Sequence, residues 1–97
     1  MSALSGQDLL EALSALANPH RLQIVTALLN ETNYVSQLAR EIGISRPLLI
    51  MHLKKLEDAG LVRSRLELSG DGKAMRYYEV LDFDIHLTPA MIAKSQT

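Results

Sequence analysis

The order of apolar and polar residues predicts two helices in the first thirty positions. Apolar residues recur at helical spacing over residues 7–17, which is typical of an amphipathic helix. Asn18 followed by Pro19 is typical of an N-cap and a first helical position, so a second helix is predicted from there to about Asn30. This second helix has leucine and isoleucine on more than one side, which predicts that it is central and heavily buried.

Two shorter helices are predicted next, each with a serine at its start and a glycine at its end. The first is predicted over residues 36–42, with Ser36 as its N-cap and Gly43 in the left-handed conformation that ends it. The second is predicted over residues 45–59, with Ser45 as its N-cap. Two short helices separated by a tight turn are typical of a helix-turn-helix.

After residue 60 the apolar period changes from helical to alternating. Apolar and charged residues alternate over residues 62–68, which predicts a half-buried strand. Residues 69–73 read Ser-Gly-Asp-Gly-Lys, a strong turn signal, and residues 76–81 are β-prone, so the two segments are predicted to pair as a hairpin. Residues 34–35 are compatible with a further short strand.

Together these elements predict an α+β fold, a winged helix-turn-helix with about four helices and a two-stranded β-wing. Residues 1–83 are predicted to form this domain. Residues 84–97 are weakly patterned and are expected to form a short C-terminal tail that contributes to dimerisation.

Composition excludes several classes of protein. The 97 residues are 47% apolar, enough for the core of one domain, and the absence of cysteine excludes disulfides, thiolate metal sites and cysteine nucleophiles. The three histidines show no ligand spacing, and no nucleophile motif or glycine-rich phosphate loop is present, so no enzyme is expected. The N-terminus lacks a basic signal-peptide region, and no apolar run approaches the roughly 20 residues of a membrane span. A cytoplasmic protein without a membrane partner is therefore expected.

Charge is distributed unevenly along the chain. The formal net charge is −1, but residues 40–76 contain eight basic and five acidic residues and lie between acidic flanks. A basic middle segment is compatible with a face that binds an anion such as the DNA backbone, and equally with ordinary mixed surface charge.

Three segments of the sequence resemble a known family. Residues 15–25 (ALANPHRLQIV) are similar to the signature that opens many ArsR-type winged-helix repressors. Residues 35–45 (VSQLAREIGIS) resemble their first motif helix and turn, and residues 49–62 (LIMHLKKLEDAGLV) resemble their recognition helix and its exit into the wing. The resemblance covers about residues 13–81. It implies a homodimeric regulator that binds double-stranded DNA, usually a repressor and often released by an effector, which the sequence does not identify.

The chain departs from the family pattern in its recognition helix. Many members carry polar side chains where this chain has Leu48, Ile50 and Met51. One interpretation is a DNA site rich in thymine, or read through DNA shape. The alternative is a winged-helix module that docks a protein on this face and has no intrinsic DNA specificity.

Metal sensing is not expected. The family's thiolate motif is absent, and Asp84-Ile85-His86 matches only the first half of a second known metal site. We therefore predict neither a metal nor another cofactor.

The predicted site residues fall into two groups. In the first, backbone N–H groups at the start of the third helix bind phosphate, Arg46 reads a base edge or grips a phosphate, apolar side chains contact the major groove, and further basic residues hold phosphates. This DNA-binding group is Ser36, Gln37, Ser45, Arg46, Pro47, Ile50, Met51, Lys54, Lys55, Arg63, Arg65, Lys73 and Arg76. The second group, expected at a dimer interface, is Leu4, Leu9, Leu10, Leu13 and Leu16.

Overall fold

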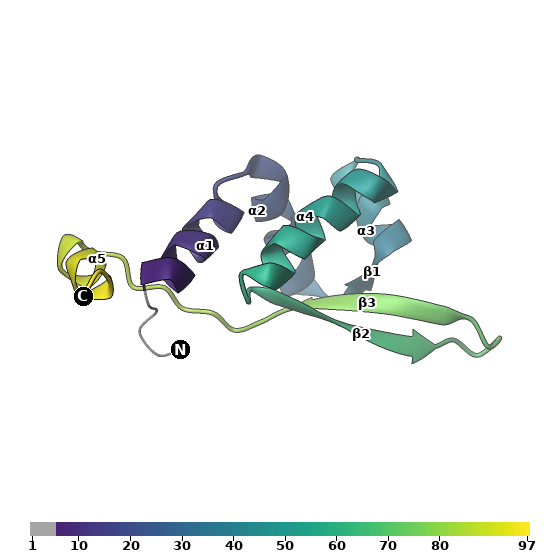
Figure 1. Ribbon diagram of the computed structural model, residues 1–97. Helices are drawn as coiled ribbons and strands as arrows, with labels where there is room; N and C mark the ends of the chain where they lie inside the picture. The colour runs from purple at the N-terminus through teal and green to yellow at the C-terminus, as the bar shows by residue number, and fades with distance from the viewer. Residues whose placement is uncertain (1–5) are drawn as a thin grey trace.

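A computed structural model describes residues 6–97 and shows a helical body that carries a small antiparallel sheet (Figure 1). In chain order the elements are α1 (Gly6–Leu16), α2 (Pro19–Asn30), β1 (Asn33–Tyr34), α3 (Val35–Ile42), α4 (Arg46–Asp58), β2 (Val62–Leu68), β3 (Ala74–Val80) and α5 (Pro89–Ser95). The predicted α+β class is confirmed. The described residues form five helices and three strands, one of each more than the predicted four helices and two-stranded wing.

Helices α2 and α4 each begin directly after a residue whose side chain caps them. The Asn18 Oδ1 atom accepts hydrogen bonds from the backbone N–H groups of His20 at 2.9 Å and Arg21 at 3.2 Å. The Ser45 Oγ atom accepts from the backbone N–H of Leu48 at 3.3 Å. Both predicted caps are therefore confirmed, and each satisfies N–H groups that a helix leaves without a partner.

The start of α3 was predicted wrongly. The helix begins at Val35, and its N-cap residue is Tyr34, whose side chain makes no capping hydrogen bond. Tyr34 is also the last residue of β1, so the chain passes directly from a paired strand into the helix and Ser36 lies within the first turn. The predicted end is confirmed, because Gly43 has a φ of 80°, the left-handed region that glycine enters at little cost.

The sheet has the strand order β1-β3-β2, with all pairs antiparallel. Strands β2 and β3 form the predicted hairpin and pair from Val62↔Val80 to Leu68↔Ala74. We call β2, β3 and the turn at residues 69–73 the wing. The outer half of the wing extends beyond the helices (Figure 1), so Leu66 and Leu68 are exposed and the prediction of a half-buried strand holds only near Val62.

The core lies where α1, α2, α3 and α4 meet the inner end of the sheet. Its fully buried large side chains are Ile24, Leu38, Leu49, Leu53, Leu56, Leu61 and Val62. Burial of such a side chain contributes on the order of 1.5–3 kcal/mol. The core therefore fixes the direction of α4 and leaves its opposite face uncovered.

The C-terminal segment contains a helix that was not predicted. Thr88 caps α5, with its Oγ1 accepting from the backbone N–H of Met91 at 3.1 Å, and Pro89 occupies the first turn. Ahead of this helix, Phe83 and Ile85 pack against the core, and α5 itself packs against α1. None of the helices in residues 6–97 has the length and apolar character to cross a membrane.

Candidate nucleic-acid interface

Helix α4 has one buried and one exposed face. Its buried side chains are Leu49, His52, Leu53 and Leu56. Its first three turns expose Arg46, Pro47, Ile50, Met51 and Lys54, which we call the reading face. All five are predicted DNA-contacting residues. Lys54 pairs with Asp58 at 3.3 Å, and Lys55 lies exposed on the following turn.

The reading face borders a groove that also involves α3 and the wing. A cavity of about 400 Å³ is lined by Ser36 from the first turn of α3, by Arg46 and Ile50 from α4, and by Met75 and Arg76 from β3. Arg46 forms no ion pair with any of the described residues. The structure thus brings three separate predicted segments around one concave surface, with an unpaired guanidinium at its edge.

Gln37 lies one residue further along α3 and is held by its neighbours. Its Oε1 atom accepts a hydrogen bond from Arg40 Nη2 at 2.6 Å, and its Nε2 donates to Glu41 at 3.4 Å. With the side chain engaged in this way, the backbone of the first turn of α3 is what remains for an anion to contact.

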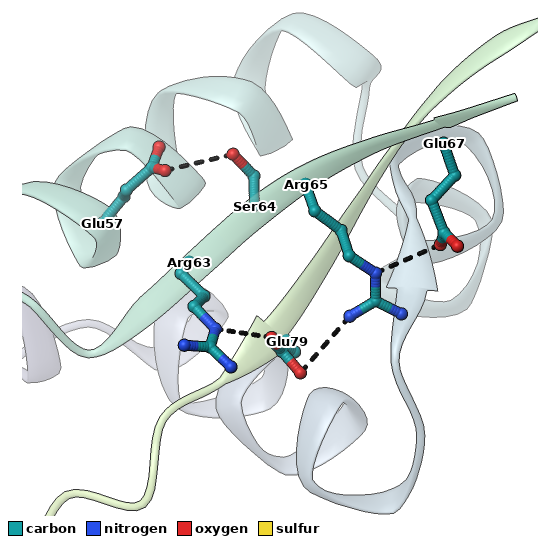
Figure 2. A network of polar contacts seen from close by, with 6 residues as sticks. All are labelled: Glu57, Arg63, Ser64, Arg65, Glu67 and Glu79. Carbon is teal, nitrogen blue, oxygen red and sulfur yellow. Dashed lines mark hydrogen bonds and ion pairs between the residues drawn. The ribbon is translucent and has the colours of Figure 1, made fainter.

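The predicted basic residues of the wing divide between two faces of the sheet. Arg63 Nε donates to Glu79 at 2.5 Å, and Arg65 pairs with Glu67 at 3.1 Å and with Glu79 at 3.5 Å (Figure 2). The hydrogen bond from Arg63 is the main reason that the pKa of Glu79 is lowered. Arg63 and Arg65 therefore already have carboxylate partners.

The other face of the wing is turned toward α4. Ser64 Oγ donates to Glu57 of α4 at 3.1 Å (Figure 2), and it accepts from Arg76 Nη1 at 3.0 Å. Since side chains alternate across a strand, Arg76 lies on the same side of the sheet as α4, opposite Arg63 and Arg65. Only Arg76 of these three arginines lines the groove beside the reading face.

The tip of the wing is an ordered turn. The Asp71 carboxylate accepts from Ser69 Oγ and from the backbone N–H of Lys73, the latter at 3.3 Å. These hydrogen bonds, the one from Ser69 first, lower the pKa of Asp71. Gly72 has a φ of 85° and supplies the left-handed residue that the turn requires. Lys73 is exposed and forms no ion pair within residues 6–97, so the turn presents a free ammonium group.

A polar cluster beneath the reading face was not anticipated from the sequence. Arg21 Nη1 lies 3.0 Å from Nδ1 of His52, and the ring of His20 lies 5.6 Å from that of His52 between centroids. Burial is the main reason that the pKa of His52 is lowered, and the positive charge of Arg21 and the proximity of His20 lower it further. The only sequence signal for this cluster is the Asn18 cap, which fixes where Arg21 lies on α2.

The residues expected at a dimer interface lie at different depths. Leu9 is buried in the core, Leu13 and Leu16 are half-buried, and Leu10 is 64% exposed. Leu4 lies outside the described residues. Leu87 and Ile92 are also exposed, around the α5 that packs on α1.

Metal ligands do not gather in the described part of the chain. No group of three or more histidine, cysteine, aspartate or glutamate side chains in residues 6–97 is placed to hold an ion. His86 and Asp84 are exposed on the segment before α5.

Comparison with known proteins gives a consistent picture. Residues 18–64 match the family model for bacterial regulatory proteins of the arsR family. An HTH-type transcriptional regulator of Methanocaldococcus jannaschii is 38% identical over 87 residues, which are 90% of each chain.

Two solved structures are similar in both sequence and fold. The homodimeric winged helix-turn-helix DNA-binding domain from Mycobacterium bovis is 28% identical, with a TM-score of 0.67 over 76% of this chain and 64% of that one. The transcriptional repressor BigR from Xylella fastidiosa is 26% identical, with a TM-score of 0.66 over 78% of this chain and 72% of that one.

Proposed function

The chain belongs to the ArsR family of regulatory proteins and is a winged-helix DNA-binding regulator of transcription, and we propose that it represses its target by binding a two-fold symmetric operator as a homodimer. The observation that carries this proposal is the groove shared by the first turn of α3, the reading face of α4 and β3. A protruding helix fits the major groove of B-DNA, and the adjacent wing then lies along the backbone.

Each part of this surface is assigned a role. The start of α3, at Ser36 and Gln37, directs backbone N–H groups at a phosphate. Arg46 has no ion-pair partner among residues 6–97 and sits in the first turn of α4 next to Ser45 and Pro47, so it is free to bind a guanine edge or the adjoining phosphate.

The remaining cations bind the phosphate backbone. Lys73 at the wing tip and Arg76 beside the groove are assigned to phosphates, together with Lys54 and Lys55 on α4. Arg63 and Arg65 can bind a phosphate only if they give up their ion pairs with Glu79. We therefore assign these two residues a smaller share of the affinity.

A homodimer is supported by the exposed apolar residues on α1 and α5 and by the homodimeric state of the related domain from Mycobacterium bovis. A two-fold axis through these terminal elements places two copies of α4 on one side of a duplex. Successive major grooves on one face are about 34 Å apart, so half-sites one helical turn apart are expected. Repression is supported by the activity of the related BigR.

The test is selection of bound duplexes from a random DNA pool by the purified protein and by two variants. Arg46→Ala removes the proposed base contact, and Gln23→Ala truncates an exposed side chain on α2, outside the reading face and the helices proposed for the dimer. We expect wild type and Gln23→Ala to select the same symmetric motif, and we expect the motif selected by Arg46→Ala to lose its base preference at one position of each half-site. Enrichment of no motif at low salt would contradict operator recognition and favour a protein partner.

A further inference from the structure

The centre of the reading face has no polar side chain. Of its five residues only Arg46 and Lys54 carry hydrogen-bond donors, and Lys54 is paired with Asp58 on the next turn. Between them lie Ile50 and Met51, which are 49% and 58% exposed. The hydroxyl of Ser45, just before the helix, is engaged in capping the N–H of Leu48. A base edge that meets the middle of α4 therefore meets hydrocarbon and a thioether.

We propose that Ile50 and Met51 recognise C5-methyl groups in the major groove, so that each half-site has thymines opposite them. This inference rests on the proposed DNA-binding function and names the feature of the DNA that α4 reads. Thymine is the only one of the four bases that presents a methyl group in the major groove. Contact with that methyl removes apolar surface of both partners from water, which is favourable.

The same side chains reject G·C pairs. Guanine presents two acceptors in the major groove and cytosine presents an amino donor. If these groups lose water against Ile50 and Met51, the lost hydrogen bonds are not replaced there, because Ile50 has no hydrogen-bonding group and Met51 has only a weakly accepting sulfur. A polar group buried without a partner is costly, so an apolar surface selects against the wrong base as well as for the methyl.

Ile50 and Met51 are expected to differ in how strictly they require a thymine. Ile50 lines the groove with Met75 and Arg76 of β3, and its β-branched side chain has few rotamers. Met51 is unbranched and flexible, and its sulfur is polarizable, so it adapts to a methyl at more than one place. We expect the position read by Ile50 to require thymine and the position read by Met51 to tolerate alternatives.

The charges around the apolar pair favour DNA over a protein as the partner. Arg46 precedes the pair by one turn, and Lys54 and Lys55 follow it by one turn. A small apolar area between cations suits a methyl-bearing groove between two phosphate backbones. An apolar protein interface depletes charged residues at its centre instead.

The experiment uses the duplex selected above and replaces each thymine, one at a time, with deoxyuridine, which removes only the methyl. Binding is measured by fluorescence anisotropy at fixed salt. We expect affinity to fall about fourfold at one or two positions of each half-site, the factor that corresponds to about 0.8 kcal/mol for one buried CH₂-sized group.

Variants assign the effect to the side chains. Ile50→Ala is expected to bind thymine and uracil duplexes equally at its own position, whereas Leu29→Ala, an exposed leucine on α2, is expected to keep the full difference. A cytosine placed at that position should bind less tightly than 5-methylcytosine, which restores the methyl.

Two results would overturn the inference. If every uracil duplex binds as tightly as its thymine counterpart, methyl recognition is wrong while DNA binding stands. If the thymine effect persists undiminished in both Ile50→Ala and Met51→Ala, the methyl is read by another part of the protein. Failure to select any duplex would instead contradict the proposed function, and this inference with it.

Discussion

Arg21 on α2 donates a hydrogen bond from Nη1 to Nδ1 of His52 on α4, over 3.0 Å. A guanidinium has only donors, so Nδ1 accepts and the proton of the neutral ring is on Nε2. The same arginine donates through Nε to the backbone carbonyl of Ala15 at 2.6 Å and through Nη2 to that of Ser14 at 3.4 Å. One side chain thus joins the C-terminal end of α1 to the buried side of the helix that carries the reading face.

The buried position of His52 beside Arg21 makes the free energy of unfolding depend on pH. Burial and the charge of Arg21 lower the pKa of His52 in the folded protein, whereas in the unfolded chain it titrates near its ordinary value of about 6.5. As pH falls below about 6.5 the unfolded chain takes up a proton that the folded protein does not. We expect the free energy of unfolding to decrease there, by at most about 1.4 kcal/mol per pH unit for this group.

Denaturant unfolding at a series of pH values between 8 and about 5 measures this effect. His52→Asn keeps a polar side chain that can accept from Arg21 but cannot titrate, so its stability should change less over this range. His86→Gln removes an exposed histidine and should leave the wild-type pH dependence in place. Equal pH dependence in wild type and His52→Asn would contradict the role given to His52.

Arg21 is expected to matter more for stability than other arginines of the helical body. Arg21→Ala leaves His52 Nδ1 and the Ala15 carbonyl without their donor, and an unsatisfied buried polar group costs about 1–3 kcal/mol. Arg40→Ala is the matched control, because Arg40 is exposed and its side chain donates to the neighbouring Gln37 on the same helix. Thermal and denaturant unfolding of both variants should show a clear loss for Arg21→Ala alone. A similar small loss in both would mean that water replaces the guanidinium.

Sequence signals were reliable where one residue dictates the local backbone. The Asn18 and Ser45 caps and the left-handed Gly43 each act through their own dihedral angles and nearest N–H groups, so they could be identified without tertiary information. Ser36 has the same capping chemistry and was still assigned wrongly. Pairing of β1 with β3 carries the backbone directly into α3, and that pairing is not visible in the local sequence.

Burial and long-range contacts could be predicted only in part. Alternation in β2 shows which side chains share a face, but Leu66 and Leu68 are exposed because none of the described helices covers the outer wing. Residues 84–97 were expected to form a weakly patterned tail, although Pro89 is favourable in the first turn of a helix such as α5. The candidate site followed from the helix-turn-helix pattern, whereas the division of the wing cations between two faces required the register of β2 on β3.

That division predicts different effects of removing two arginines of the wing. Arg76→Ala removes a cation beside the groove and should lower DNA affinity and reduce the slope of log K against log salt by about 0.9, the value for one phosphate contact on B-DNA. Arg63→Ala removes a cation that Glu79 already neutralises and should change the slope less. Salt titrations of both variants on one duplex provide the comparison.

A third variant tests whether pairing with Glu79 is the reason that Arg63 contributes less to DNA binding than Arg76. Glu79→Gln removes the carboxylate that pairs with both Arg63 and Arg65, so we expect tighter DNA binding and a steeper salt dependence than in wild type. If Arg63→Ala instead costs as much affinity as Arg76→Ala, both faces of the wing contact DNA and the pairing with Glu79 does not limit Arg63.

The proposed dimer is tested by placing a charge on α1. Leu10 is 64% exposed on the helix that packs against α5, and Leu10→Glu would bury an unpaired carboxylate in an interface formed there. Leu29→Glu is the matched control, because Leu29 is 74% exposed on α2. Sedimentation equilibrium should show a dimer for wild type and Leu29→Glu and a monomer for Leu10→Glu. Because a monomer contacts only one half-site, Leu10→Glu should also bind a symmetric duplex far more weakly while binding a single half-site as wild type does. If Leu29→Glu dissociates the dimer and Leu10→Glu does not, the interface lies on α2 and a different spacing between half-sites is expected.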